Sequence, residues 1–157
     1  MPQVIAIGQA TVGPAASEFT VQLVRAMVAE QLDVSVLITT EDASADAQSV
    51  LSALVDAGAH DSTWLRVPHD APKPALERAL GRFSKDQWVI VLGNVLPIFY
   101  RPLFCALVSA PRSTDIPEAR RIAPHADLQV SSPSEKLAVE IAKLIRAKAL
   151  VRSGSTG

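Results

Sequence analysis

Short apolar runs alternate with amphipathic segments along most of the chain. The apolar runs are rich in Val, Ile and Leu, and their length is typical of strands that are buried on both faces. We expect strands at residues 3–7, 33–40, 62–67, 87–92, 103–110 and 127–132. The segments between them repeat apolar residues at helical spacing. We expect helices at residues 15–32, 41–59, 72–83, 115–123 and 132–151.

This alternation predicts an α/β fold with three layers, in which helices cover both faces of a mainly parallel sheet. Residues 1–151 form one domain, and we expect 152–157 to be a flexible C-terminal tail. The carboxyl ends of parallel strands meet at one edge of the sheet, and ligands of such folds bind there. The loops at that edge are residues 8–14, 39–45, 68–72, 92–102 and 110–115.

The last predicted helix has an apolar face and a choice of caps. Ser132 or Ser134 can cap its start, because a hydroxyl can accept a hydrogen bond from a free backbone amide of the first turn. Its apolar face is formed by Leu137, Ile141, Leu144, Ile145 and Ala149.

The first loop has the spacing of a phosphate-binding loop but lacks its chemistry. In "VIAIGQATVGPA", Gly8 and Gly13 are separated by four residues, between a strand and a helix. A working loop continues with Lys, which neutralises phosphate, and with Ser or Thr, which binds Mg²⁺. Pro14 and Ala15 stand there instead. The simplest interpretation is a tight turn with Pro14 as the first helical residue.

The loop nevertheless retains backbone amides and a helix N-terminus, which can attract an anion. An anion or ligand site at the strand ends is therefore a second interpretation, and a weakly bound nucleotide or other anion is compatible with it. Its candidate residues come from the first loop and from later loops: Gly8, Gln9, Thr11, Gly13, Asn94, Arg101 and Arg112.

The fourth strand also ends without the expected chemistry. In many nucleotide hydrolases a strand such as "VIVL" ends in an acidic residue that holds Mg²⁺ or orients water. Here the strand ends in Leu92, Gly93 and Asn94, so no carboxylate is present.

Several pieces of the chain resemble the molybdopterin-guanine dinucleotide biosynthesis protein B family, which belongs to the P-loop class of nucleoside triphosphatases. They are "VIAIGQATVGPA", "VSVLITT", "LVDAGAHDSTWLRVP", "VIVLGNVLPIFYRP", "LFCALVSAPRS" and "HADLQVSS", in the family's order over most of the chain. The resemblance implies a P-loop-like fold and an accessory role in the assembly of metalloenzyme cofactors.

The departures from the family's pattern concern its reactive positions. Pro14 replaces the phosphate-binding Lys, Ala15 replaces the Mg²⁺-binding hydroxyl, and Leu92 stands where relatives carry an acidic residue. With both Walker motifs degenerate, we expect a pseudoenzyme without catalytic residues, metal ligands or a resident cofactor. It would act as a binding or scaffolding factor, as a homodimer or with a metalloenzyme or cofactor-assembly protein. Two alternatives are a protein that binds a phosphorylated or pterin-like ligand at the strand ends and a structural subunit of a complex.

Composition and net charge argue against two classes of partner, nucleic acids and membranes. The chain has 157 residues and a formal net charge of −1, which gives no general attraction to nucleic acid or to anionic membranes. Its single cysteine, Cys105, lies in an apolar run, where a buried and unreactive thiol is expected. We therefore expect a cytoplasmic protein that binds neither nucleic acid nor a membrane.

The segment "PIFYRP" is the most unusual loop. It places Ile98, Phe99 and Tyr100 beside an arginine and between two prolines, so it either packs under the sheet or forms a protein contact. Other candidates have simpler explanations. His69 and Asp70 form an acid–base pair or are solvated loop residues, and the acidic residues of 41–46 favour a helix start or hold a metal.

Overall fold

The computed structural model describes residues 2–40 and 47–155. Its strands are β1 (Gln3–Gln9), β2 (Val34–Thr40), β3 (Ser62–Arg66), β4 (Trp88–Leu92), β5 (Phe104–Val108) and β6 (Leu128–Val130). Its helices are α1 (Ala15–Ala29), α2 (Ala47–Asp56), α3 (Pro72–Leu80), α4 (Leu96–Phe99), α5 (Ala119–Ile122), the 3₁₀ turn η1 (Ala123–His125) and α6 (Glu135–Ser155).

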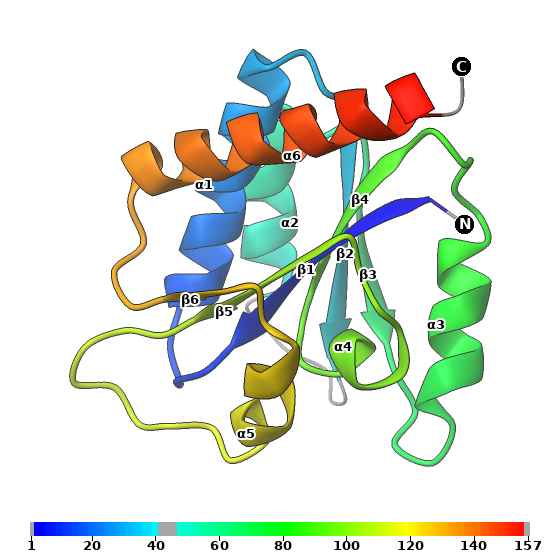
Figure 1. The fold of residues 1–157 in the computed structure, drawn as a ribbon. Coiled ribbons are helices and arrows are strands. Elements are labelled where there is room, and N and C mark those ends of the chain that lie inside the picture. The colour runs from blue at the N-terminus through cyan, green and yellow to red at the C-terminus, as the bar shows by residue number, and fades with distance from the viewer. Residues whose placement is uncertain (1, 41–46, 156–157) are drawn as a thin grey trace.

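The six strands form one parallel sheet in the order β3-β2-β4-β1-β5-β6. The predicted α/β class is therefore confirmed, and the sheet is parallel throughout. Strand β1 lies inside it, with β4 on one side and β5 on the other (Figure 1). A single antiparallel bridge outside these strands joins Thr11 to Asp115.

Alternating strand residues supply two separate cores. Ile5 and Ile7 of β1 pack in the core that contains residues of α1, α2 and α6. Val4 and Ala6 point the other way, into the core that contains residues of α3, α4 and α5. The four inner strands β1, β2, β4 and β5 are covered on both faces, so they are buried and mostly apolar at consecutive positions. The arrangement is three-layered and consistent with a P-loop-like fold (Figure 1).

The connections define one special point at the carboxyl edge of the sheet. From β1 the chain passes through α1 to β2, on one side of β1, whereas from the adjacent β4 it passes through α4 to β5, on the other side. The two connections cross over opposite faces of the sheet, with α1 packing in the first core and α4 in the second. Neighbouring strands whose connections leave over opposite faces have room between their carboxyl ends, a crevice in which ligands of open α/β sheets bind. The first loop and residues 92–94 meet at this crevice.

Several boundaries differ from the predicted ones. Helix α1 begins at Ala15, so Pro14 is its N-terminal flanking residue rather than its first helical residue. Helix α4 was not predicted, because four residues are too few to show helical periodicity. Helix α6 continues to Ser155 and so includes most of the predicted tail. The predicted role of residues 41–46 lies outside the described residues.

Helix α6 also resolves the two sequence-based questions about its cap and its face. Ser134 caps the helix, because its Oγ accepts a hydrogen bond from the amide of Leu137 at 3.2 Å. Ile141 and Ile145 are buried as predicted, but Leu144 is 58% exposed, so its place on the apolar face was wrong. Within the part of the chain that the structure describes, no helix is long and apolar enough to cross a membrane.

Candidate functional site

The inside of the first loop is occupied by a side chain of the loop itself. Gln9 Nε2 donates hydrogen bonds to the carbonyl oxygens of Thr11, at 2.9 Å, and of Gly13, at 2.8 Å. A phosphate cradle needs backbone N–H groups that converge on the ligand. Here two carbonyl oxygens converge on an amide donor instead, so this part of the loop presents the wrong polarity to an anion.

Three backbone amides of the same loop are already used by the fold. The amide of Gln9 donates to Asn94, that of Ala10 to the carbonyl of Val108, and that of Val12 to the carbonyl of Thr114. The side chain of Thr11 is also engaged, since its hydroxyl accepts from the amide of Ala110 at 3.0 Å. These bonds attach the loop to the segment after β5 and occupy three of its backbone donors.

Asn94 closes the crevice between β1 and β4. Its Oδ1 accepts from the amide of Gln9 at 2.6 Å, and its Nδ2 donates to the carbonyl of Gln9 at 2.9 Å. The side-chain amide therefore pairs with both backbone groups of one residue. Gly8 permits this approach, because a Cβ at that position would lie 3.3 Å from Asn94 Oδ1 and 3.2 Å from Leu107. The crevice is filled by Asn94 and by its fit against Gly8.

The carboxyl end of β4 is packed just as closely against β2. Thr39 is buried, and its hydroxyl donates to the carbonyl oxygen of Leu92 at 3.2 Å. Gly93 follows with φ +150°, and a Cβ there would overlap the Thr39 hydroxyl and lie 2.8 Å from its carbonyl oxygen. The residues that end and follow β4, Leu92, Gly93 and Asn94, supply no carboxylate at this point.

A cavity of about 700 Å³ lies beside the first loop. The carboxyl ends of β1, β2 and β4 and the starts of α1 and α2 contribute to its walls, which include Gln9, Pro14, Ser17, Thr39 and Gly93. None of the described residues that line it is charged. The cavity can therefore accommodate an uncharged group, but those residues cannot neutralise a triphosphate or its magnesium ion.

The structure brings together five of the seven residues predicted for an anion site. Gly8, Gln9, Thr11, Gly13 and Asn94 all lie at the crevice or in the adjoining loop.

The two arginines do not complete this group. Arg112 is exposed in the loop after β5, with φ +63°, at the same edge of the sheet. Arg101 precedes β5 and lies toward its amino end, where the amide of Leu103 donates to the carbonyl of Val4. Val4 and Gly8 are four residues apart, or about 13 Å along a strand. The prediction that Arg101 joins the first-loop site was wrong, because the chain must cross the sheet's length before β5 can run parallel to β4.

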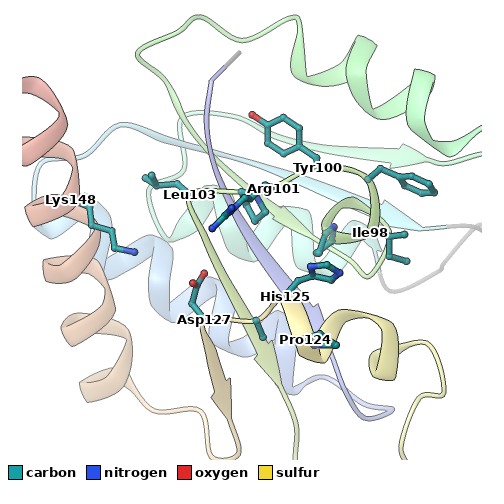
Figure 2. Close-up of a pocket in the computed structure, with 12 residues that line it drawn as sticks. Ile98, Tyr100, Arg101, Leu103, Pro124, His125, Asp127 and Lys148 are labelled. Atoms are coloured by element: carbon teal, nitrogen blue, oxygen red, sulfur yellow. The ribbon is translucent and has the colours of Figure 1, made fainter. Parts of the chain in front are cut away.

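Arg101 instead belongs to a second cavity of about 700 Å³ (Figure 2). The interface candidates Ile98, Phe99 and Tyr100 line it as well. Ile98 and Phe99 are 37% and 44% exposed, whereas Tyr100 is half-buried against the second core. The segment is therefore divided, since Tyr100 packs against the second core whereas Ile98 and Phe99 are accessible.

Three lining residues of this cavity were missed by the sequence reasoning: His125, Asp127 and Lys148. They come from η1, from the residue before β6 and from α6, so no local motif connects them. The usable signal was that Arg101 and Asp127 both precede parallel strands, which places them at the same edge of the sheet.

The histidines do not form a metal centre. His60 Nδ1 lies 3.7 Å from a carboxylate oxygen of Asp33, and both side chains are exposed. His69 and Asp70 are exposed after the edge strand β3 and line neither the cavity beside the first loop nor the cavity at Arg101. Among the described residues, no three His, Cys, Asp or Glu side chains are arranged to hold a metal ion.

Cys105 is buried in β5, as expected from its apolar surroundings. Burial raises the pKa of its thiol from 9.0 to about 11, and the negative charge of Asp127 contributes to the rise. The carboxylate of Asp127 accepts from the amide of Cys105 at 2.7 Å. A thiol that stays protonated at neutral pH is a poor nucleophile, so Cys105 has a packing role.

The chain is thus a three-layer α/β protein in which Asn94 fills the crevice between the carboxyl ends of β1 and β4. No family model and no curated protein matches the chain.

Replacing Gly93 by Ala tests how tightly the end of β4 is packed. We expect Gly93→Ala to lower the free energy of unfolding by about 3–5 kcal/mol, because it adds steric overlap with buried Thr39 to backbone strain. Gly13→Ala is the matched control, since Gly13 has φ +120° but nothing within 4 Å of the added Cβ. It should cost about 1–2 kcal/mol, from strain alone. Equal losses in urea denaturation of the two variants would contradict the packing at Thr39.

The raised pKa of Cys105 predicts a loss of stability in alkali. The thiol of the unfolded chain ionises near pH 9, whereas the folded thiol keeps its proton until about pH 11. Between these values the unfolded state binds fewer protons, so the free energy of unfolding should fall by about 1–3 kcal/mol as the pH rises. Cys105→Ala should show a shallower decline in denaturant titrations at pH 8.5–11. Identical slopes would show that the thiol does not carry this dependence.

Proposed function

We propose that the protein is a non-hydrolytic binding protein built on a P-loop-like scaffold. The observation that carries this proposal is the Gln9 side chain, which fills the first loop and bonds to the carbonyls of Thr11 and Gly13. A nucleotide phosphate would have to displace this amide and then face two carbonyl oxygens. The protein would also lose the hydrogen bonds that hold the loop.

The charge distribution supports the same proposal. Catalysis of phosphoryl transfer depends on cations that stabilise the charge of the transferred phosphate. Pro14 and Ala15 stand at the positions of the phosphate-binding Lys and the Mg²⁺-binding hydroxyl. Leu92 stands at the position of the acidic residue, and its backbone carbonyl accepts a hydrogen bond from Thr39. The cavity beside the loop supplies no charged side chain from its described lining.

An accessory role agrees with the resemblance to the molybdopterin-guanine dinucleotide biosynthesis protein B family. We propose that the partner is a second copy of the chain or a protein of cofactor or metalloenzyme assembly. The accessible Ile98 and Phe99 on α4 provide an apolar contact for it. Exposed apolar side chains that lie together are a feature of protein interaction sites.

The absence of charge among the described lining residues of the cavity beside the first loop favours a second candidate function, the binding of a flat neutral ring such as a pterin. The cavity's volume of about 700 Å³ is within the range of small-molecule sites. Thr39, Thr40 and Ser49 offer hydroxyl groups near its walls for hydrogen bonds to ring atoms. Like the first candidate function, it uses the P-loop-like scaffold and involves no nucleotide hydrolysis.

Nucleotide assays test the non-hydrolytic proposal directly. With ATP or GTP and Mg²⁺, we expect no turnover above the uncatalysed rate and no shift of the melting temperature. The double variant Pro14→Lys, Ala15→Ser should also be inactive, because Gln9 still fills the loop and Leu92 provides no carboxylate. Micromolar nucleotide binding with hydrolysis by the unmodified protein would overturn the proposal.

Charged substitutions on exposed apolar residues test the contact on α4. Phe99→Asp should abolish either a concentration-dependent dimer in sedimentation or the capture of a specific protein from the native host. Leu144→Asp is the matched control, because Leu144 is also exposed but lies on α6. If both variants keep the same mass and the same captured proteins as the unmodified chain, α4 is not the contact.

A further inference from the structure

The cavity lined by Arg101 lies toward the amino ends of β5 and β6, away from the first loop (Figure 2). Its walls come from α4 and the residues after it, from η1 and the residues before β6, and from α6. Figure 2 shows Arg101 and Asp127 pointing toward one another, with Lys148 reaching in from α6. The cavity is thus a place where side chains from distant parts of the sequence converge.

The charged residues that line this cavity carry more positive than negative charge. Arg101 and Lys148 contribute two positive charges, and Asp127 contributes one negative charge. The carboxylate of Asp127 is partly committed to the fold, because its Oδ2 accepts from the amide of Cys105. Within the described part of the chain, no acidic side chain lies within 4.0 Å of the charged groups of Arg101 or Lys148. An anion that entered the cavity would therefore meet two cations that make no ion pair with the described acidic residues.

Two aromatic residues, Phe99 and Tyr100, are among the remaining lining residues. Figure 2 shows the Tyr100 ring directed away from Arg101 and Asp127, and Tyr100 packs against the second core. The amino group of Lys148 lies 5.7 Å from the centre of the Phe104 ring, which is buried in the first core and does not line the cavity. The guanidinium group of Arg101 matches the oxygens of a phosphate or carboxylate in a forked geometry. His125 adds a donor nitrogen to the same cavity.

From this combination we propose that the cavity binds a small phosphate monoester. A phosphate monoester is mostly a dianion at neutral pH, which suits a cavity with two cations and one partly committed carboxylate. A volume of about 700 Å³ is far larger than an inorganic phosphate needs and lies in the range of sites for whole small molecules. The accessible Phe99 among the lining residues provides a contact for the organic part of the ligand.

This site is independent of the proposed non-hydrolytic first loop. The two cavities share no lining residue, and they involve different ends of the strands. Binding at Arg101 therefore requires neither a nucleotide in the first loop nor a protein partner on α4.

The experiment uses the full chain and three probes followed by amide NMR: phenyl phosphate, inorganic phosphate and phenol. We expect saturable shifts with phenyl phosphate at the amides of Tyr100, Arg101 and Leu103 and of residues 125–127, and weaker binding of the two partial probes. Arg101→Gln and Lys148→Gln should each weaken phenyl phosphate binding about tenfold, because each removes a charge-assisted hydrogen bond. Arg112→Gln is the control, since Arg112 is exposed and lies outside the cavity. Its affinity should be unchanged.

Two outcomes would overturn the proposal. One is the absence of saturable shifts with phenyl phosphate in a protein whose spectrum is that of a folded chain. The other is an equal affinity in Arg101→Gln and Arg112→Gln, which would place the anion elsewhere. Shifts confined to residues 9–17 would show binding at the first loop instead, and would contradict the non-hydrolytic account of that loop as well.

Discussion

The pairing of the Asn94 side chain with both backbone groups of Gln9 is the constraint on which the strand-end region depends. At 2.6 and 2.9 Å, these bonds join the carboxyl ends of β1 and β4, whose connections leave over opposite faces of the sheet. A Cβ at Gly8 would make a tight contact with Asn94, at 3.3 Å, and a Cβ at Gly93 would overlap Thr39. In the first loop that follows, the side-chain amide of Gln9 is turned toward the carbonyl oxygens of Thr11 and Gly13. The crevice is thus a structural joint of the sheet.

The spacing of Gly8 and Gly13 suggests a phosphate-binding loop. The joint retains the scaffold of such a loop but not its chemistry. The space next to the joint is uncharged along its described lining, whereas positive side chains converge toward the amino ends of β5 and β6. The two cavities therefore differ in the charge of their described lining residues. In the proposed function, the exposed part of α4 is the surface for a partner, and it lies beside the charged cavity.

Sequence periodicity predicted the sheet well, because parallel strands covered on both faces are apolar at consecutive positions. The same reasoning identified the missing groups at Pro14, Ala15 and Leu92, which are visible as residue types. It failed for Arg101, because loop 92–102 was treated as one site although its chain crosses from the carboxyl end of β4 to the amino end of β5. The amide of Gln9 was placed in the site, but only its two hydrogen bonds reveal that it fills the loop.

The most direct test of the account is the NMR signal of the Gln9 side-chain amide. Its hydrogen bonds to Thr11 and Gly13 should slow the exchange of these protons with water, and millimolar GTP with Mg²⁺ should leave both signals and the Gly13 amide unchanged. Fast exchange of the Gln9 amide, or a saturable shift of these signals with GTP, would show that the loop opens to a phosphate and would contradict the account.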